Sequence, residues 1–192
     1  MNGLEILSDF IEAPRRAADD ARRRPSVLLG LAGYLVAALS LFMARKLVGQ
    51  AGLAGTFLFA LAALFVLRAG LGVVQTGVVH LVAEALGGRG GAVPLFTLMG
   101  LSELAWALVL PAVLIVQAAG AHSGWVFMAI FSLAYLLSLS LKARSIRHNY
   151  GLGTVKAWSA LLFPYAAAAA VAAAALTAAL VAVFQQVVQA LA

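Results

Sequence analysis

The chain has 192 residues, of which 64% are hydrophobic and only 10% are charged. Soluble domains are about half apolar and a quarter charged, so this composition excludes a soluble globular protein and indicates one bundle of membrane helices. The net charge of +6 comes from basic residues at the ends of apolar runs, which argues against nucleic-acid binding. The lack of cysteine excludes a disulfide framework and thiolate chemistry.

Residues 1–24 are predicted to form a cytoplasmic amphipathic segment. Apolar residues recur at helical spacing before Pro14, a pattern typical of a short helix lying on a membrane surface; they are Leu4, Leu7, Phe10 and Ile11. Between Pro14 and Pro25, charges four residues apart predict a solvated polar helix held by the pairs Arg15–Asp19, Arg16–Asp20 and Asp19–Arg23. No cleavable signal is recognisable, so the first span is expected to direct membrane insertion.

Residues 25–192 are predicted to form one membrane domain with five spans, at about residues 25–43, 52–86, 94–118, 125–141 and 164–184. The second run is longer than a perpendicular crossing needs. One crossing is favoured over two, because it leaves only Arg45 and Lys46 outside and gathers the flanking basic residues inside. The sequence therefore predicts a multi-pass membrane protein with its N-terminus in the cytoplasm and its C-terminus outside.

Two features of these spans bear on packing. The long second helix must tilt, kink near Gly70 and Gly72, or project beyond the outer surface, and the sequence leaves all three open. The fifth span is rich in alanine, which allows close helix approach in lipid. It is therefore expected to be central or tightly packed.

A glycine-rich hairpin joins the second and third spans through Gly87, Gly88, Gly90 and Gly91. Before it, a seven-residue repeat of Gly70, Gly77 and Glu84 should face a neighbouring helix, with His80 on the same side and Arg68 and Gln75 on the opposite face. Folding the hairpin about Gly90 places Glu103 opposite residue 77, near His80. It also places Arg68 beside Pro111, where it could satisfy the freed Ala107 carbonyl or extend outward.

The candidate intramembrane site consists of His80, Glu84 and Glu103, with Arg68 and Gln75 nearby, and would bind a proton, a cation or a lipid headgroup. The favoured alternative is structural. In that reading His80 and Glu84 fix helix register, and Glu103 is protonated or bonded to Ser102 or the backbone. Neither a metalloprotease spacing nor a phosphate loop nor a serine elbow is present, so we predict no metal, no cofactor and no enzymatic activity.

A set of basic residues flanks the spans at the predicted inner surface. These side chains either contact anionic lipid or simply set topology; they are Arg22, Arg23, Arg24, Arg89, Lys142, Arg144, Arg147 and Lys156.

Four segments carry a family resemblance. They are Phe10–Arg15 with Pro25 at the membrane entry, the His80–Gly88 helix end with its double glycine, the stretch from Ser102 to Pro111, and the basic exit from Leu139 to Ala157. In these segments the chain resembles the Yip family (Ypt-interacting proteins) of five-span membrane proteins. Eukaryotic members bind Rab-type GTPases on the cytosolic side and act in vesicle traffic and membrane shaping.

The resemblance implies a cytosolic N-terminus and a C-terminus on the far side. Only about 24 residues precede the first span, whereas eukaryotic members carry a long cytosolic region, and this difference argues against GTPase binding. The short termini and the bias toward alanine, glycine and arginine are similar to those of a bacterial homologue, which implies a location in a bacterial cytoplasmic membrane.

The sequence thus predicts an all-α, five-span bundle acting as a non-enzymatic, membrane-organising scaffold of Yip type. Its expected partners are the lipid bilayer and other membrane proteins or further copies of the chain. The alternative is a small transporter or lipid-translocating protein using His80, Glu84, Glu103 and Arg68.

Overall fold

The computed structural model describes residues 9–10, 12–49, 57–120 and 123–191, and within these ranges it contains helices and no strand. The elements are α2 (Pro14–Arg23), α3 (Val27–Leu47), α4 (Phe57–Ala85), α5 (Ala92–Ser102), the 3₁₀ helix η1 (Glu103–Leu108), α6 (Val109–Ala118), α7 (Gly124–Tyr150) and α8 (Thr154–Leu191). Five helical segments are long and apolar enough to cross a membrane, with α5, η1 and α6 forming one of them. The predicted all-α class with five such helices is confirmed.

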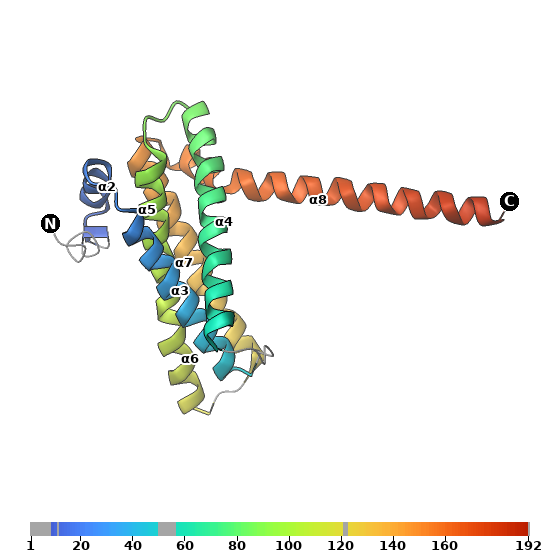
Figure 1. Cartoon of the computed structure of the whole chain (residues 1–192), viewed down its shortest axis with the longest axis horizontal. Coiled ribbons are helices and arrows are strands. Elements are labelled where there is room, and N and C mark those ends of the chain that lie inside the picture. Colours follow the sequence, from blue (N-terminus) through green and yellow to red (C-terminus); the bar gives the residue numbers. More distant parts are fainter. Residues whose placement is uncertain (1–8, 11, 50–56, 121–122, 192) are drawn as a thin grey trace.

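Four of these segments stand side by side as a bundle, and α8 leaves it at a steep angle (Figure 1). The closest helix contact joins α3 to α5, where a Cβ atom on Gly33 would overlap the carbonyl group of Gly100. Thr97 on α5 also donates a hydrogen bond to the Ser26 carbonyl, with an Oγ1 to oxygen distance of 3.1 Å. Glycine at this crossing therefore sets the distance between the two helices.

The helix α4 forms one continuous apolar segment, as the favoured single crossing requires, and its predicted start at residues 52–56 lies outside the described residues. The predicted orientation of its glycine stripe is wrong. A Cβ atom on Gly70 or Gly77 would meet nothing within 4 Å, whereas one on Gly72 would overlap the Tyr34 ring. The packed face of α4 is thus the one that carries Gly72, Arg68 and Gln75.

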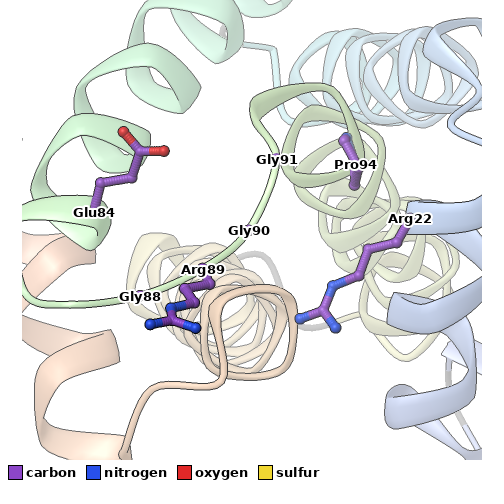
Figure 2. Close-up of a pocket in the computed structure, with 7 residues that line it drawn as sticks. All are labelled: Arg22, Glu84, Gly88, Arg89, Gly90, Gly91 and Pro94. Carbon is purple, nitrogen blue, oxygen red and sulfur yellow. The ribbon is translucent and has the colours of Figure 1, made fainter.

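The loop between α4 and α5 crosses close to the C-terminal end of α7 (Figure 2). Gly87 adopts a left-handed conformation with a φ angle of +88°, which favours glycine. The backbone amide of Arg89 donates to the Tyr150 carbonyl at 3.1 Å, and the Tyr150 side chain occupies the space that a Cβ on Gly88 or Gly90 would fill. The predicted glycine hairpin is confirmed, and its glycines also admit the neighbouring helix.

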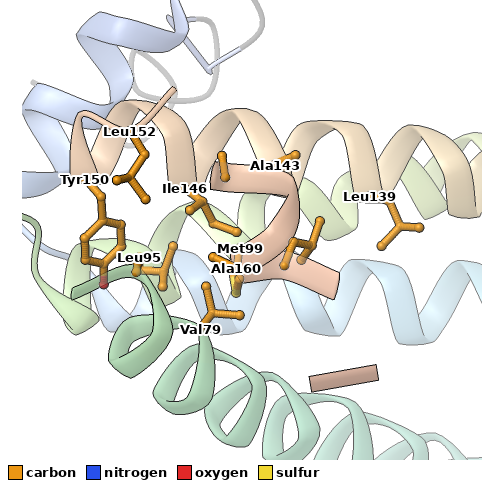
Figure 3. Packing of buried hydrophobic residues seen from close by; sticks show 12 residues of the cluster. Val79, Leu95, Met99, Leu139, Ala143, Ile146, Tyr150, Leu152 and Ala160 are labelled. Carbon is orange, nitrogen blue, oxygen red and sulfur yellow. The ribbon is translucent and has the colours of Figure 1, made fainter. Parts of the chain in front are cut away.

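A buried cluster joins α4, α5, α7 and the first turns of α8 (Figure 3). The predicted fourth span ended near residue 141, but α7 continues to Tyr150 because residues 142–150 pack into this cluster and the hairpin. Gly151, with a φ angle of +66°, then ends the helix.

Only the beginning of α8 packs against the bundle, through Ala157, Ala160 and Leu161. From Leu162 to Gln189 no residue is buried. The expectation that the fifth span is central or tightly packed is therefore wrong within this structure, because its alanine surface contacts no helix of the same chain.

The helix α2 lies against the flank of the bundle (Figure 1). Its three alanines Ala17, Ala18 and Ala21 are fully or almost fully buried against Leu98 and Leu101 of α5. The helix is thus docked by one face rather than solvated all round. Of the predicted ion pairs none forms among the described residues, and Asp19 pairs instead with Arg22 at 3.5 Å. The predicted Leu4–Ile11 helix lies mostly outside the described residues.

Candidate functional site

The most polar contact inside the bundle joins three charged side chains from three helical segments. The Glu103 carboxylate accepts from Arg68 of α4 at 2.9 Å and from Lys142 of α7 at 2.5 Å, one cation on each oxygen. Glu103 and Lys142 are buried, and the Arg68 side chain is 17% exposed. We refer to these three residues as the charge triad.

The backbone around Glu103 explains how it reaches this position. The helix tightens into the 3₁₀ turn η1 at Glu103, a few residues before Pro111, which has no N–H to offer the Ala107 carbonyl. The Ser40 hydroxyl lies 2.8 Å from the Trp106 carbonyl oxygen and 3.5 Å from that of Ala107. Neither of the two alternatives predicted for Arg68 is seen, because its guanidinium pairs with Glu103, while Ser40 lies within donor range of the Ala107 carbonyl.

Two further side chains extend the triad. Lys142 donates to the Gln75 amide oxygen at 3.3 Å, and the Gln75 amide nitrogen donates to the Tyr165 hydroxyl of α8 at 2.8 Å. On the other side the Arg68 guanidinium lies 4.7 Å from the centre of the Trp106 ring, a cation–π distance. A continuous polar chain thus connects η1, α7, α4 and the start of α8.

The depth of the triad follows from helix contacts at either end of α3. At one end of α3, Thr97 donates to the Ser26 carbonyl, and at the other end Gln117 donates to the Leu47 carbonyl at 2.6 Å. The segment from 97 to 117 therefore packs along the full length of α3. Glu103 lies six residues past Thr97, roughly 9 Å along the axis. An apolar layer of about 30 Å that contains α3 therefore also contains the triad.

The triad carries two cations and one carboxylate. Each charge is costly in an apolar environment, and pairing offsets the cost only for opposite charges. The cluster therefore retains one positive charge that no described carboxylate balances. Close by, the buried Tyr34 hydroxyl has no hydrogen-bond partner among the described residues.

His80 and Glu84, predicted to accompany Glu103, lie in a separate cluster near the hairpin. The His80 Nδ1 atom lies 2.7 Å from the Tyr150 hydroxyl, and its Nε2 atom lies 3.5 Å from the half-exposed Glu84 carboxylate. Thr76 contacts the Met99 sulfur at 3.4 Å, so the hairpin pairs residues several positions earlier on α4 than folding about Gly90 would. The grouping of all three residues in one site is wrong for this reason.

Two predicted residues, Arg68 and Gln75, do lie at the site, and Lys142 is the member that sequence reasoning assigned elsewhere. The sequence predicts Lys142 to be one of the basic residues at the inner surface, because it follows an apolar run and precedes Arg144. Its 7% exposure contradicts a lipid-facing position. The spacing of seven residues between Arg68 and Gln75 was the available signal for a polar face directed into the bundle.

The other predicted basic residues lie around the hairpin end. Arg22 donates to the carbonyls of His148 and Asn149, and Lys156 donates to the Leu86 carbonyl at 3.0 Å. Arg22 and Arg89 also line a cavity of about 640 Å³ with Glu84 and the hairpin glycines (Figure 2). Within the described ranges no three His, Cys, Asp or Glu side chains are grouped so as to hold a metal ion.

Comparison of the chain with family models, curated proteins and solved structures gives no match. The function is therefore argued from the site and the surfaces of this chain alone.

Proposed function

We propose that this protein is a non-enzymatic membrane scaffold of Yip type, which organises other membrane components through its uncovered apolar helix. The observation that carries the proposal is the surface of α8, which is exposed from Leu162 to Gln189. This stretch is about 40 Å long, enough to cross an apolar layer once α8 turns at its junction with α7 from the steep angle of Figure 1 toward the direction of the bundle.

The composition of α8 indicates what can surround it. Between Tyr165 and Gln185 it carries no charged side chain and no polar face, so it cannot lie at a membrane surface as an amphipathic helix does. It needs lipid or other apolar helices on all sides. Its many alanines favour helices, because small side chains let two backbones approach closely and gain van der Waals contact.

The charge triad supports a structural role for the bundle. Both carboxylate oxygens of Glu103 are occupied by protein cations, and Ser40 donates to the Trp106 carbonyl and lies 3.5 Å from the Ala107 carbonyl that Pro111 frees. A path for solutes needs polar groups open to water along its length, whereas a scaffold needs them satisfied within the protein. The triad ties α4, η1 and α7 together and leaves α8 free for partners.

The proposal includes placement in a bacterial cytoplasmic membrane, with the N-terminus in the cytoplasm and the C-terminus outside. It is supported by the gathering of basic residues around α2, the hairpin and the α7–α8 junction, with only Arg45 and Lys46 near the other end of α3. Tags on Met1 and Ala192 should be reachable from opposite compartments. Accessibility of both tags from one side would refute this topology.

Photo-crosslinking in native membranes tests the scaffold proposal. A photoreactive phenylalanine analogue is placed at Val171 or Leu180 of α8, and at the equally exposed Ile115 of α6 as a control. We expect protein adducts, either with another membrane protein or with a second copy, from the two α8 positions and mainly lipid adducts from Ile115. Lipid adducts alone from both α8 positions would refute the proposal.

A second candidate, a small transporter or lipid-translocating protein, is favoured by the excess positive charge of the triad. An unbalanced charge within an apolar layer is a typical mark of an ion or substrate path. Anion or lipid flux across proteoliposomes would be compared between wild type and Glu103→Gln, with Gly70→Ala as a matched control on an open surface. Flux that Glu103→Gln alone abolishes, while its helical content in circular dichroism stays that of the wild type, would favour this candidate. Absence of flux in all three proteins would exclude it.

A further inference from the structure

Four arginines gather where α2 meets the last turns of α7. Arg15 and Arg16 come from α2, and Arg144 and Arg147 come from α7; we call this set the arginine pocket. With Ala13 and His148 they line a cavity of about 520 Å³. An adjoining cavity of about 330 Å³ shares Arg15 and Arg147 and reaches Asp19 and Gly151.

The packing of α2 holds these like charges together. The buried alanines of α2 fix it against α5 and α7, so its exposed arginines are held beside those of α7 on one surface. Among the described residues no carboxylate lies within ion-pair distance of any of the four, and the nearby Asp19 pairs with Arg22. Arg147 makes one neutral hydrogen bond, to Thr154 at 3.3 Å. The pocket therefore concentrates positive charge that no described carboxylate compensates, and it should attract an anionic group.

The chemistry of the pocket selects a phosphate group. Guanidinium groups are planar and always charged, and they bind phosphate oxygens through paired N–H donors. Several arginines from two helices can contact one phosphate from different directions. Such a group is carried by a phospholipid headgroup or by a soluble phosphate compound.

The surface of α7 beside the pocket favours the lipid. Arg144, Ser140, Leu137 and Leu133 follow one another at helical spacing along one face of α7. Leu137 is 41% exposed and Leu133 is 67% exposed, so the charged position continues into an open apolar track. The track runs roughly 16 Å from Arg144 to Leu133, toward the outer end of the bundle.

We propose that the arginine pocket binds the headgroup phosphate of an anionic phospholipid, with one acyl chain lying along Leu137 and Leu133. The site is distinct from the charge triad and does not depend on the scaffold function. It includes Arg15 and Arg16 of α2, so the bound lipid joins α2 to α7.

Equilibrium binding of a fluorescent phosphatidylglycerol to the full chain in zwitterionic detergent tests this site. The variants are Arg15→Gln/Arg16→Gln and Arg144→Gln/Arg147→Gln. The control is Arg23→Gln/Arg24→Gln, which removes the same charge from exposed arginines outside the pocket. Each basic residue near anionic lipid contributes roughly a fivefold gain in affinity, so each pocket variant should bind roughly 30-fold more weakly. The control should weaken binding clearly less than either pocket variant does, because its two charges lie outside the pocket.

Three results would overturn the proposal. Equal weakening in all three double variants would indicate general attraction by net charge. Equal binding of phosphatidylcholine would exclude recognition of the anionic lipid, and displacement of the lipid probe by an equal concentration of glycerol phosphate would assign the pocket to a soluble phosphate compound. Because Arg15 and Arg16 are exposed, their variant should keep the wild-type helical content in circular dichroism, so its binding result stands even if the α7 variant fails to fold.

Discussion

Replacing Glu103 by glutamine should be among the most damaging isosteric changes in this protein. The substitution keeps the side-chain shape and one carbonyl oxygen for Arg68, but it removes the charge that both cations share. Removing one partner from a buried ion pair typically costs about 3–5 kcal/mol, because the remaining charge stays buried without compensation. Here two cations lose their counter-charge, so we expect a loss of at least about 3 kcal/mol in the free energy of unfolding.

The matched control is Lys142→Met. This change removes one positive charge from the triad and brings its net charge to zero, whereas Glu103→Gln removes the one negative charge. It leaves a neutral Arg68–Glu103 pair, since Arg68 is held to the second oxygen of the carboxylate. The two lost hydrogen bonds, to Glu103 and Gln75, are offset by the removal of an unbalanced buried charge, so the free energy of unfolding should change by no more than about 1 kcal/mol. The double variant Glu103→Gln/Lys142→Met should recover at least about 1.5 kcal/mol relative to Glu103→Gln alone.

Unfolding by titration of sodium dodecyl sulfate into mixed micelles, followed by far-ultraviolet circular dichroism, measures all four free energies. A Glu103→Gln variant no less stable than Lys142→Met would refute the charge balance assigned to the triad.

Two further predictions concern packing near this site. Gly33→Ala should destabilise the folded bundle by about 2 kcal/mol or more, because its Cβ would overlap the Gly100 carbonyl, whereas Gly70→Ala should be neutral or stabilise α4 by up to about 1 kcal/mol. Thermal unfolding in detergent compares the two, and similar melting temperatures would contradict the α3–α5 contact. Ser40→Ala should cost about 0.5–1.5 kcal/mol because the Trp106 carbonyl loses one of its two donors and keeps the Val109 N–H, and retention of full stability in the same assay would contradict that role.

The five helices could be predicted because their signals are local. Long apolar runs and glycine breaks follow from neighbouring residues, and each helix satisfies its own backbone hydrogen bonds in an apolar environment. The prediction of α4 as one crossing rather than two rests instead on the distribution of basic residues along the whole chain. The left-handed Gly87 in the hairpin is equally local, since glycine adopts that conformation without steric cost.

The composition of the candidate site could be predicted only in part. Arg68, Gln75 and Glu103 were recognised as polar residues within apolar runs, but their partners depend on hairpin register. In the structure α5 and η1 pair with residues several positions earlier on α4 than folding about Gly90 predicts. The neighbour of Glu103 is therefore Arg68 rather than His80. The place of Lys142 in the triad could not be predicted, because a basic residue after an apolar run has the same sequence pattern whether it faces lipid headgroups or the bundle interior.

The sequence by itself determined that this chain folds into apolar helices, how many there are and near which glycines they end. Only the tertiary structure decided that Glu103 unites Arg68 with Lys142, that Gly72 rather than Gly70 faces a neighbour, and that α8 leaves the bundle. The physical reason is that hydropathy measures the preference of a side chain for an apolar environment over water. Lipid and protein interior both satisfy that preference, so only packing distinguishes them.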